Sequence, residues 1–98
     1  MTASPMKRIY FDHSATSRVL PEVFEAMAPF YTERFGNASS LHSFGREAKA
    51  SMELARKHLA ALINAEPGEI VFTSGGTEAD NLAVKGVAAY KGRAKGHI

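Results

Sequence analysis

The stretch "FTSGGTEADN" (72–81) decides the fold, because it joins an apolar run to a helical pattern through a turn of small residues. Ile70, Val71 and Phe72 lead into this stretch and predict a strand over 69–73. The apolar positions that follow recur at a helical period of about 3.6 residues and predict a helix that starts near Thr77. These positions are Ala79, Leu82, Ala83, Val87 and Tyr90.

Small residues between a strand and a helix are typical of an anion site. The first backbone N–H groups of a helix have no partner, and the helix dipole places partial positive charge there, so phosphate binds well. Gly75 and Gly76 would let an anion reach the amides, and some turn positions require positive φ. Ser74 and Thr77 add hydroxyl donors. The sequence therefore makes this turn a candidate phosphate-binding site, beside one alternative.

A plain turn between strand and helix is the alternative, with Thr77 as the helix N-cap and Asp80 three residues on. The stretch contains neither the lysine of GxxxxGK[ST] nor the glycine spacing of GxGxxG, so neither of those phosphate motifs applies. The carboxylates of Glu78 and Asp80 suit the helix dipole, and we expect both to point away from a bound phosphate.

The first half of the chain predicts a short strand and a helix interrupted by proline. Residues 9–11 are apolar and β-prone, and a turn-rich segment follows them. Pro21 suits the first turn of a helix, whereas Pro29 must kink or interrupt that helix because proline lacks a backbone N–H. Residues 34–45 are rich in glycine, asparagine, serine and histidine, and predict an ordered polar loop.

The strongest helical pattern covers 44–62, where one apolar stripe lies opposite charged residues. The segment "NAEPGE" (64–69) ends this helix with a proline and a glycine. From the stripe we predict that Leu59 and Leu62 are buried against a neighbouring element, which a partner chain can supply.

The order of helix, strand, glycine turn and helix indicates an α/β class with a parallel sheet. Only one strand is firmly indicated, however, and one strand makes no sheet. The amphipathic helices also need a flat layer on which to pack. We therefore expect residues 1–98 to form a partial domain of a larger protein, with no complete domain.

Composition excludes several classes of protein. The 98 residues include no cysteine, which excludes disulfides, a thiolate zinc site and a cysteine nucleophile within this chain. No two histidines have metal-ligand spacing with a third ligand, so we expect no metal.

The net charge of +2 is too mild to indicate nucleic acid, and Lys91, Arg93 and Lys95 indicate a solvated turn. The longest apolar run, "LAALI" (59–63), predicts no membrane span, and without a signal peptide the expected compartment is the cytoplasm.

Four motifs occur in a fixed order along the chain. They are "YFDHSAT" (10–16), "FGNASSLHSFGREAK" (35–49), "EIVFTSGGTEADNLAVKG" (69–86) and "KGHI" (95–98). Together they resemble the N-terminal part of cysteine desulfurases, the pyridoxal-phosphate enzymes of the class V aminotransferase group. The resemblance implies a fold-type I transferase architecture that works as a homodimer. Such enzymes move sulfur from L-cysteine to a persulfide on their own cysteine, release L-alanine, and pass the sulfur to iron–sulfur cluster assembly or another acceptor.

The resemblance also implies roles for individual residues. Gly75, Gly76 and Thr77 match the segment that holds the phosphate of pyridoxal 5′-phosphate with backbone amides and the threonine hydroxyl. The other site positions that it implies, all in loops near the active site, are Asp12, His13, Ala15, Asn37 and His42. The loop of Asn37 has Ala38 where the family usually has proline. For His13 and His42 the alternative is that of polar loop histidines hydrogen-bonded to the backbone.

Several parts of the family's machinery are expected beyond residue 98. The resemblance implies a Schiff-base lysine in a serine–histidine–lysine context and a persulfide cysteine, and this chain contains neither. The motif "KGHI" matches the start of the family's next strand. We therefore expect a truncated piece that is inactive by itself and needs the remainder of the enzyme or a homodimer partner. The alternatives are a stand-alone phosphate-binding or interaction module, and a fragment of another class V enzyme such as a selenocysteine lyase.

Overall fold

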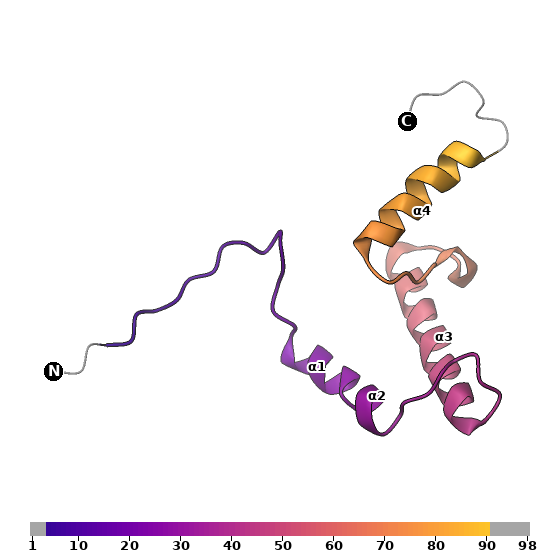
Figure 1. Ribbon diagram of the computed structural model, residues 1–98, viewed down its shortest axis with the longest axis horizontal. Coiled ribbons are helices and arrows are strands. Elements are labelled where there is room, and N and C mark those ends of the chain that lie inside the picture. Colours follow the sequence, from indigo (N-terminus) through magenta and orange to yellow (C-terminus); the bar gives the residue numbers. More distant parts are fainter. Residues whose placement is uncertain (1–3, 91–98) are drawn as a thin grey trace. The chain divides into compact units, whose positions relative to one another are not determined.

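The computed structural model describes residues 4–90, and the helices of this part account for all of its regular secondary structure (Figure 1). The elements are α1 (Pro21–Met27), α2 (Pro29–Thr32), α3 (Ser43–Ile63), the short 3₁₀ helix η1 (Pro67–Glu69) and α4 (Gly76–Ala89). The chain divides into two units, Met1–Ser51 and Met52–Ile98. In the described part, no helix is both long and apolar enough to cross a bilayer.

The proline-interrupted helix is confirmed. α1 starts with Pro21 at its first position and ends at Met27, and α2 then starts at Pro29. The amide of Ala28 still bonds the carbonyl of Phe24 at 2.9 Å. Pro29 has no N–H to continue this ladder, so the helix is broken into two short pieces.

The loop before α3 is closed by one arginine. The Arg34 guanidinium contacts the Glu47 carboxylate at 2.6 Å and donates to the Ser51 hydroxyl at 3.3 Å. It also lies 4.6 Å from the ring centroid of Phe30. These contacts tie the end of α2 to the first half of α3, so the polar loop is ordered as predicted.

Two glycines allow this loop to approach the start of α3 closely. A Cβ on Gly45 would lie 2.2 Å from the carbonyl oxygen of Ser40, and a Cβ on Gly36 would lie 2.5 Å from that of Phe44. The rings of Phe35 and Phe44 stack at 5.4 Å between centroids over the same junction. The junction therefore excludes any side chain at both glycine positions.

α3 agrees with the predicted helix and ends in a defined cap. Asn64 has a positive φ of 55°, and the amide of Ala65 bonds the carbonyl of Ala60 at 2.9 Å. This is the Schellman arrangement, in which a left-handed residue closes the last turn. The expected end of the helix at "NAEPGE" is confirmed, and Pro67 begins η1 three residues later.

The prediction that Leu59 and Leu62 are buried is wrong for this chain. Their exposed fractions are 43% and 80%, and Ala60, at 2%, is the one buried hydrophobic residue within residues 4–90. The helix is amphipathic, but the described part of the chain contains no layer that covers its apolar stripe. Periodicity predicts which side of a helix is apolar, and it does not supply the surface that buries that side.

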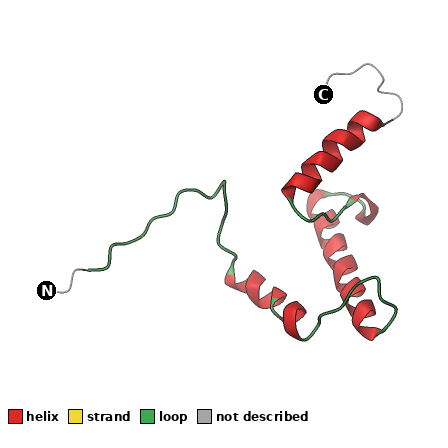
Figure 2. Ribbon diagram, in the orientation of Figure 1, coloured by secondary structure: helices red, strands yellow, loops and turns green. Residues whose placement is uncertain are grey.

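The expected strands at 9–11 and 69–73, and the parallel sheet, are not formed within residues 4–90 (Figure 2). Ile70 has extended backbone angles, φ −89° and ψ 123°, but no second strand lies beside it there. A strand needs a partner to accept and donate its backbone hydrogen bonds, so extended residues alone stay irregular. The expected start of a further strand at "KGHI" lies outside the described residues, as do Lys91, Arg93 and Lys95.

The extended segment before the glycine turn is held by a side chain of α3. Arg56 on α3 donates from Nη1 to the carbonyl oxygen of Ile70, and its guanidinium lies 4.9 Å from the ring centroid of Phe72. Its Nε also contacts the Glu53 carboxylate at 3.3 Å. Within the second unit these contacts hold the segment that leads into the glycine turn.

The junction of loop and helix can be tested at Gly45. We expect Gly45→Ala to lower the free energy of unfolding by about 1–3 kcal/mol, because the new methyl group must displace backbone atoms. Gly68→Ala is the matched control, since a Cβ there meets no atom within 4 Å. Urea unfolding of the full-length protein that carries this segment measures both. Equal free energies for the two variants would contradict the close approach.

Candidate functional site

The candidate site is the turn that precedes α4. The first backbone bond of α4 runs from the amide of Ala79 to the carbonyl of Gly75 at 3.1 Å, so Gly75 is the N-cap and Gly76 the first helical residue. The predicted helix start near Thr77 is therefore confirmed. The interpretation of Thr77 as the N-cap is wrong, because Thr77 is the second residue of the helix. No side chain of the described residues caps this end of α4.

The start of α4 presents a set of free donors. The amides of Gly75, Gly76, Thr77 and Glu78 precede the first ladder bond and donate to no acceptor among residues 4–90. The helix dipole adds partial positive charge at this end. N–H donors and positive potential are what an anion with several oxygens requires, so the donor set fits a phosphate group.

The glycines of this turn are not required by backbone strain. Gly75 has φ 166° and ψ −177°, which is extended backbone, so the expectation of a positive φ is not met at this position. A Cβ on Gly75 or Gly76 would meet no atom within 4 Å. The space at both Cβ positions is therefore open within residues 4–90.

The Glu78 carboxylate is bonded to the residue that precedes the two glycines. Its Oε2 atom accepts the Ser74 amide at 2.8 Å and the Ser74 hydroxyl at 2.5 Å. Ser74, expected to be a donor to the anion, is thus engaged by Glu78. The hydrogen bond from the Ser74 hydroxyl, followed by that from its amide, lowers the pKa of the Glu78 carboxyl below its ordinary value of 4.5.

Three of the other candidate residues lie in one turn of the first unit. The amide of Ala15 bonds the carbonyl of Asp12 at 3.1 Å, and Tyr10 closes the turn by donating its hydroxyl to the carbonyls of Asp12 and Thr16 at 2.8 and 2.9 Å. His13 packs edge-on against the Tyr10 ring, 4.9 Å between centroids. The structure therefore brings Asp12, His13 and Ala15 together.

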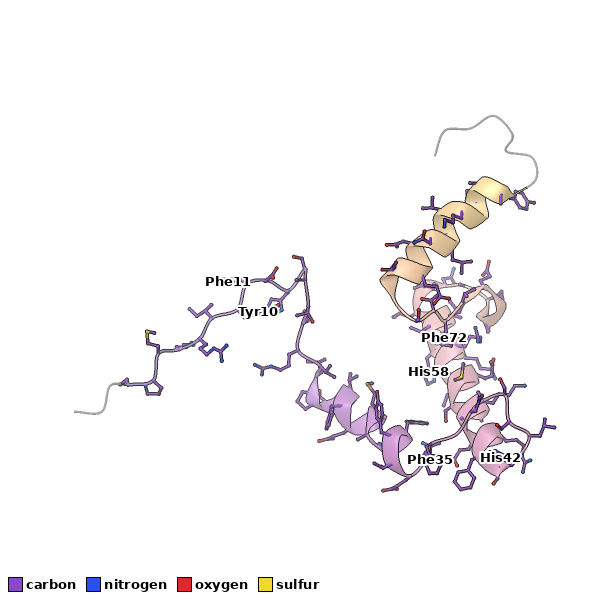
Figure 3. The ribbon with its side chains drawn as sticks, viewed as in Figure 1. Tyr10, Phe11, Phe35, His42, His58 and Phe72 are labelled. Atoms are coloured by element: carbon purple, nitrogen blue, oxygen red, sulfur yellow. The ribbon has the colours of Figure 1, made fainter. Side chains whose placement is uncertain are left out.

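Asn37 and His42 both support the backbone of their loop. The Asn37 Oδ1 atom accepts the amide of Ser39 at 2.9 Å, and the His42 Nδ1 atom accepts the amide of Gly45 at 3.3 Å. The amide of Arg46 bonds the His42 carbonyl at 3.0 Å, so His42 caps α3 (Figure 3). His42 therefore has the hydrogen bond to backbone that one of its two interpretations expects. His13 instead contacts the Ser17 hydroxyl, with Nδ1 and Oγ 3.2 Å apart.

Sequence reasoning missed the side chains that shape these turns. The sequence predicts Tyr10 as part of an apolar run and Thr73 as the end of a strand, yet the Thr73 hydroxyl donates to the Gly75 carbonyl at 3.1 Å. Asn81 similarly donates from Nδ2 to the Thr77 carbonyl at 2.8 Å. A hydroxyl two residues before an N-cap was the available signal for Thr73. No group of three metal-ligating side chains occurs in the part of the chain that the structure describes.

The lowered pKa of Glu78 has a testable sign. Because that pKa is lower in the folded protein than in the unfolded chain, the carboxylate stabilises the fold above the ordinary value of 4.5, and this contribution is lost as the pH falls through the lowered pKa. We therefore expect the free energy of unfolding to fall more steeply with acidification in the wild type than in Glu78→Gln. Urea unfolding of the full-length protein across acidic pH measures this. Parallel pH dependences would contradict the ionised hydrogen bond.

Comparison with known proteins gives consistent matches along the chain. Residues 9–98 match the sequence model of the family described as aminotransferase class V. The cysteine desulfurase IscS of Clostridium botulinum (strain Hall) is 53% identical over 91 residues, which cover 93% of this chain and 23% of that protein. The IscS proteins of Dictyoglomus turgidum and Rickettsia felis are 55% and 50% identical, over 85% and 97% of this chain. The chain spans less than a quarter of the length of these relatives, with 21% and 23% of the latter two covered.

Proposed function

Because the chain belongs to the class V aminotransferase family, we propose that it is the N-terminal portion of a cysteine desulfurase. The complete enzyme would move sulfur from L-cysteine to a persulfide on its own cysteine and release L-alanine. Identities of 50–55% to proteins of that name, over most of this chain, support the assignment. The match to one part of the relatives supports a partial domain whose remaining elements are supplied by the rest of the enzyme.

The family depends on pyridoxal phosphate, and the proposed share of this segment is the phosphate end. The backbone amides of Gly75, Gly76 and Thr77 would donate to the phosphate oxygens, together with the Thr77 hydroxyl. The free donors before the first ladder bond of α4 are the observation that carries this proposal. When bound, the cofactor supplies an electron sink for chemistry at the amino-acid substrate.

The chain's own residues would bind and orient the cofactor without performing the chemistry. A phosphate held by several fixed donors would anchor one end of the cofactor. The remainder of the site would position the reacting end. Ser74 is excluded from this donor set because its amide and hydroxyl are bonded to Glu78. Since Glu78 carries negative charge close to the turn, the donors must outweigh its repulsion of a phosphate dianion.

The sulfur-transfer step would take place on residues outside this segment. The chain has no cysteine, so a persulfide must form elsewhere in the complete enzyme. We propose a homodimer in the cytoplasm that hands sulfur to an iron–sulfur scaffold or to another sulfur acceptor. In the complete enzyme, the loops of Asp12, Asn37 and His42 would lie near the active site.

If the chemistry depends on residues outside this segment, the chain by itself should be inactive. We expect the purified 98-residue chain to release no sulfide from L-cysteine, because it has neither the lysine context nor the persulfide cysteine of the family. Sulfide is measured with pyridoxal phosphate and L-cysteine present, with and without the chain. Sulfide release above the protein-free control would overturn the expectation.

The phosphate role can be tested at Thr77 in the full-length protein. We expect Thr77→Ala to weaken binding of pyridoxal phosphate by about 1.5–3 kcal/mol, through loss of a hydrogen bond to a charged group. Thr77→Ser keeps the hydroxyl and is expected to retain affinity. The unfolding free energy of the apo-protein should change little, because Thr77 is not the N-cap.

Gly76→Val gives a steric test of the same site. Its Cβ would meet no atom of residues 4–90 within 4 Å, so we expect a loss of affinity to arise from the space that the phosphate takes. Cofactor titration of the wild type and the variants, beside urea unfolding of each apo-protein, separates binding from stability. Unchanged cofactor affinity in both Thr77→Ala and Gly76→Val would remove the support for this phosphate site.

A further inference from the structure

Two side chains that donate nothing to the proposed phosphate determine the shape of its turn. The Thr73 hydroxyl donates to the carbonyl oxygen of Gly75 at 3.1 Å. Glu78 accepts both the amide and the hydroxyl of Ser74 on one oxygen, at 2.8 and 2.5 Å. The first contact joins Thr73 to the N-cap residue Gly75. The second joins Ser74 to Glu78 in the first turn of α4.

The Thr73 bond fixes the direction of a neighbouring amide. The carbonyl of Gly75 and the N–H of Gly76 belong to one planar peptide unit and point in opposite directions. The Gly75 oxygen accepts from the Thr73 hydroxyl and from the amide of Ala79, each at 3.1 Å. Because two donors hold this oxygen, the direction of the Gly76 N–H is set as well.

The Glu78 bonds keep another amide available. In a capping box, the side chain at the third helical position accepts the amide of the N-cap residue. Glu78 occupies this third position of α4, yet it accepts the amide of Ser74, one residue before the N-cap. The amide of Gly75 is therefore left without an acceptor within residues 4–90, while the residue before it is anchored.

We propose that Thr73 and Glu78 are positioning residues for the phosphate group, which aim the amides of Gly75 and Gly76 before a ligand arrives. The inference rests on the proposed function of this turn as the phosphate site. Donors that already point toward the ligand are not reorganised on binding, so the cost of ordering the turn is met during folding. Removal of either side chain leaves every donor present but lets the donors lose their direction.

The experiment uses the full-length apo-protein and two matched pairs of variants. Thr73→Val removes the hydroxyl at nearly constant shape, and Thr73→Ser keeps it. Glu78→Ala removes the acceptor oxygen and Glu78→Gln keeps one, while both remove the charge, so repulsion of the phosphate is equal in this pair. Dissociation constants are measured for pyridoxal phosphate and for pyridoxal, which lacks the phosphate group. Urea unfolding of each apo-protein reports stability separately.

The first member of each pair should bind pyridoxal phosphate roughly threefold to tenfold more weakly than the second, as expected for the loss of one hydrogen bond. Affinity for pyridoxal should be the same within each pair. Equal affinities for pyridoxal phosphate within both pairs would overturn the inference, and so would equal losses for pyridoxal and its phosphate, which indicate a general structural role. If the wild type itself binds pyridoxal and pyridoxal phosphate equally, the proposed phosphate site fails and this inference fails with it.

Discussion

The site depends on one constraint of helix geometry, which is that the first amides of a helix have no carbonyl within that helix to bond. In α4 the ladder opens at the carbonyl of Gly75, and the amides from Gly75 to Glu78 stay free within the described residues. The surrounding side chains of the described part do not accept from these amides. The Thr73 hydroxyl donates to the Gly75 carbonyl, and Glu78 accepts from Ser74. The donors of the proposed phosphate site are thus left over by the fold itself.

A second constraint is the lack of a core within residues 4–90. Ala60 is the single buried hydrophobic residue of this part, although the helices carry well-formed apolar faces. Burial of apolar surface is the main favourable term in folding, so faces as exposed as Leu62, at 80%, need a covering layer. The match of this chain to less than a quarter of its relatives is consistent with that layer lying elsewhere in a longer protein.

The features that the sequence predicted correctly are those with a local cause. Pro29 interrupts its helix because of its own missing N–H, and the end of α3 follows from residues directly after it. The strand at 69–73 and the burial of Leu59 depend on distant partners, which local patterns do not contain. At the candidate site, the predicted helix start near Thr77 is confirmed, whereas the alternative with Thr77 as the N-cap is wrong, because Gly75 is the N-cap. Hydroxyl and carboxylate contacts such as that of Glu78 depend on rotamers, which residue types alone do not determine.

The contact between Arg56 and the carbonyl of Ile70 has a consequence for the order of assembly during synthesis. It spans a short loop of chain, so its closure requires no residue beyond Phe72. In a longer protein made from its N-terminus, α3 and the segment after it can therefore join as soon as they leave the ribosome. The Ile70 oxygen has a second lone pair, so it can still accept one more hydrogen bond. Arg56 would then hold this segment in place while the rest of such a protein is translated.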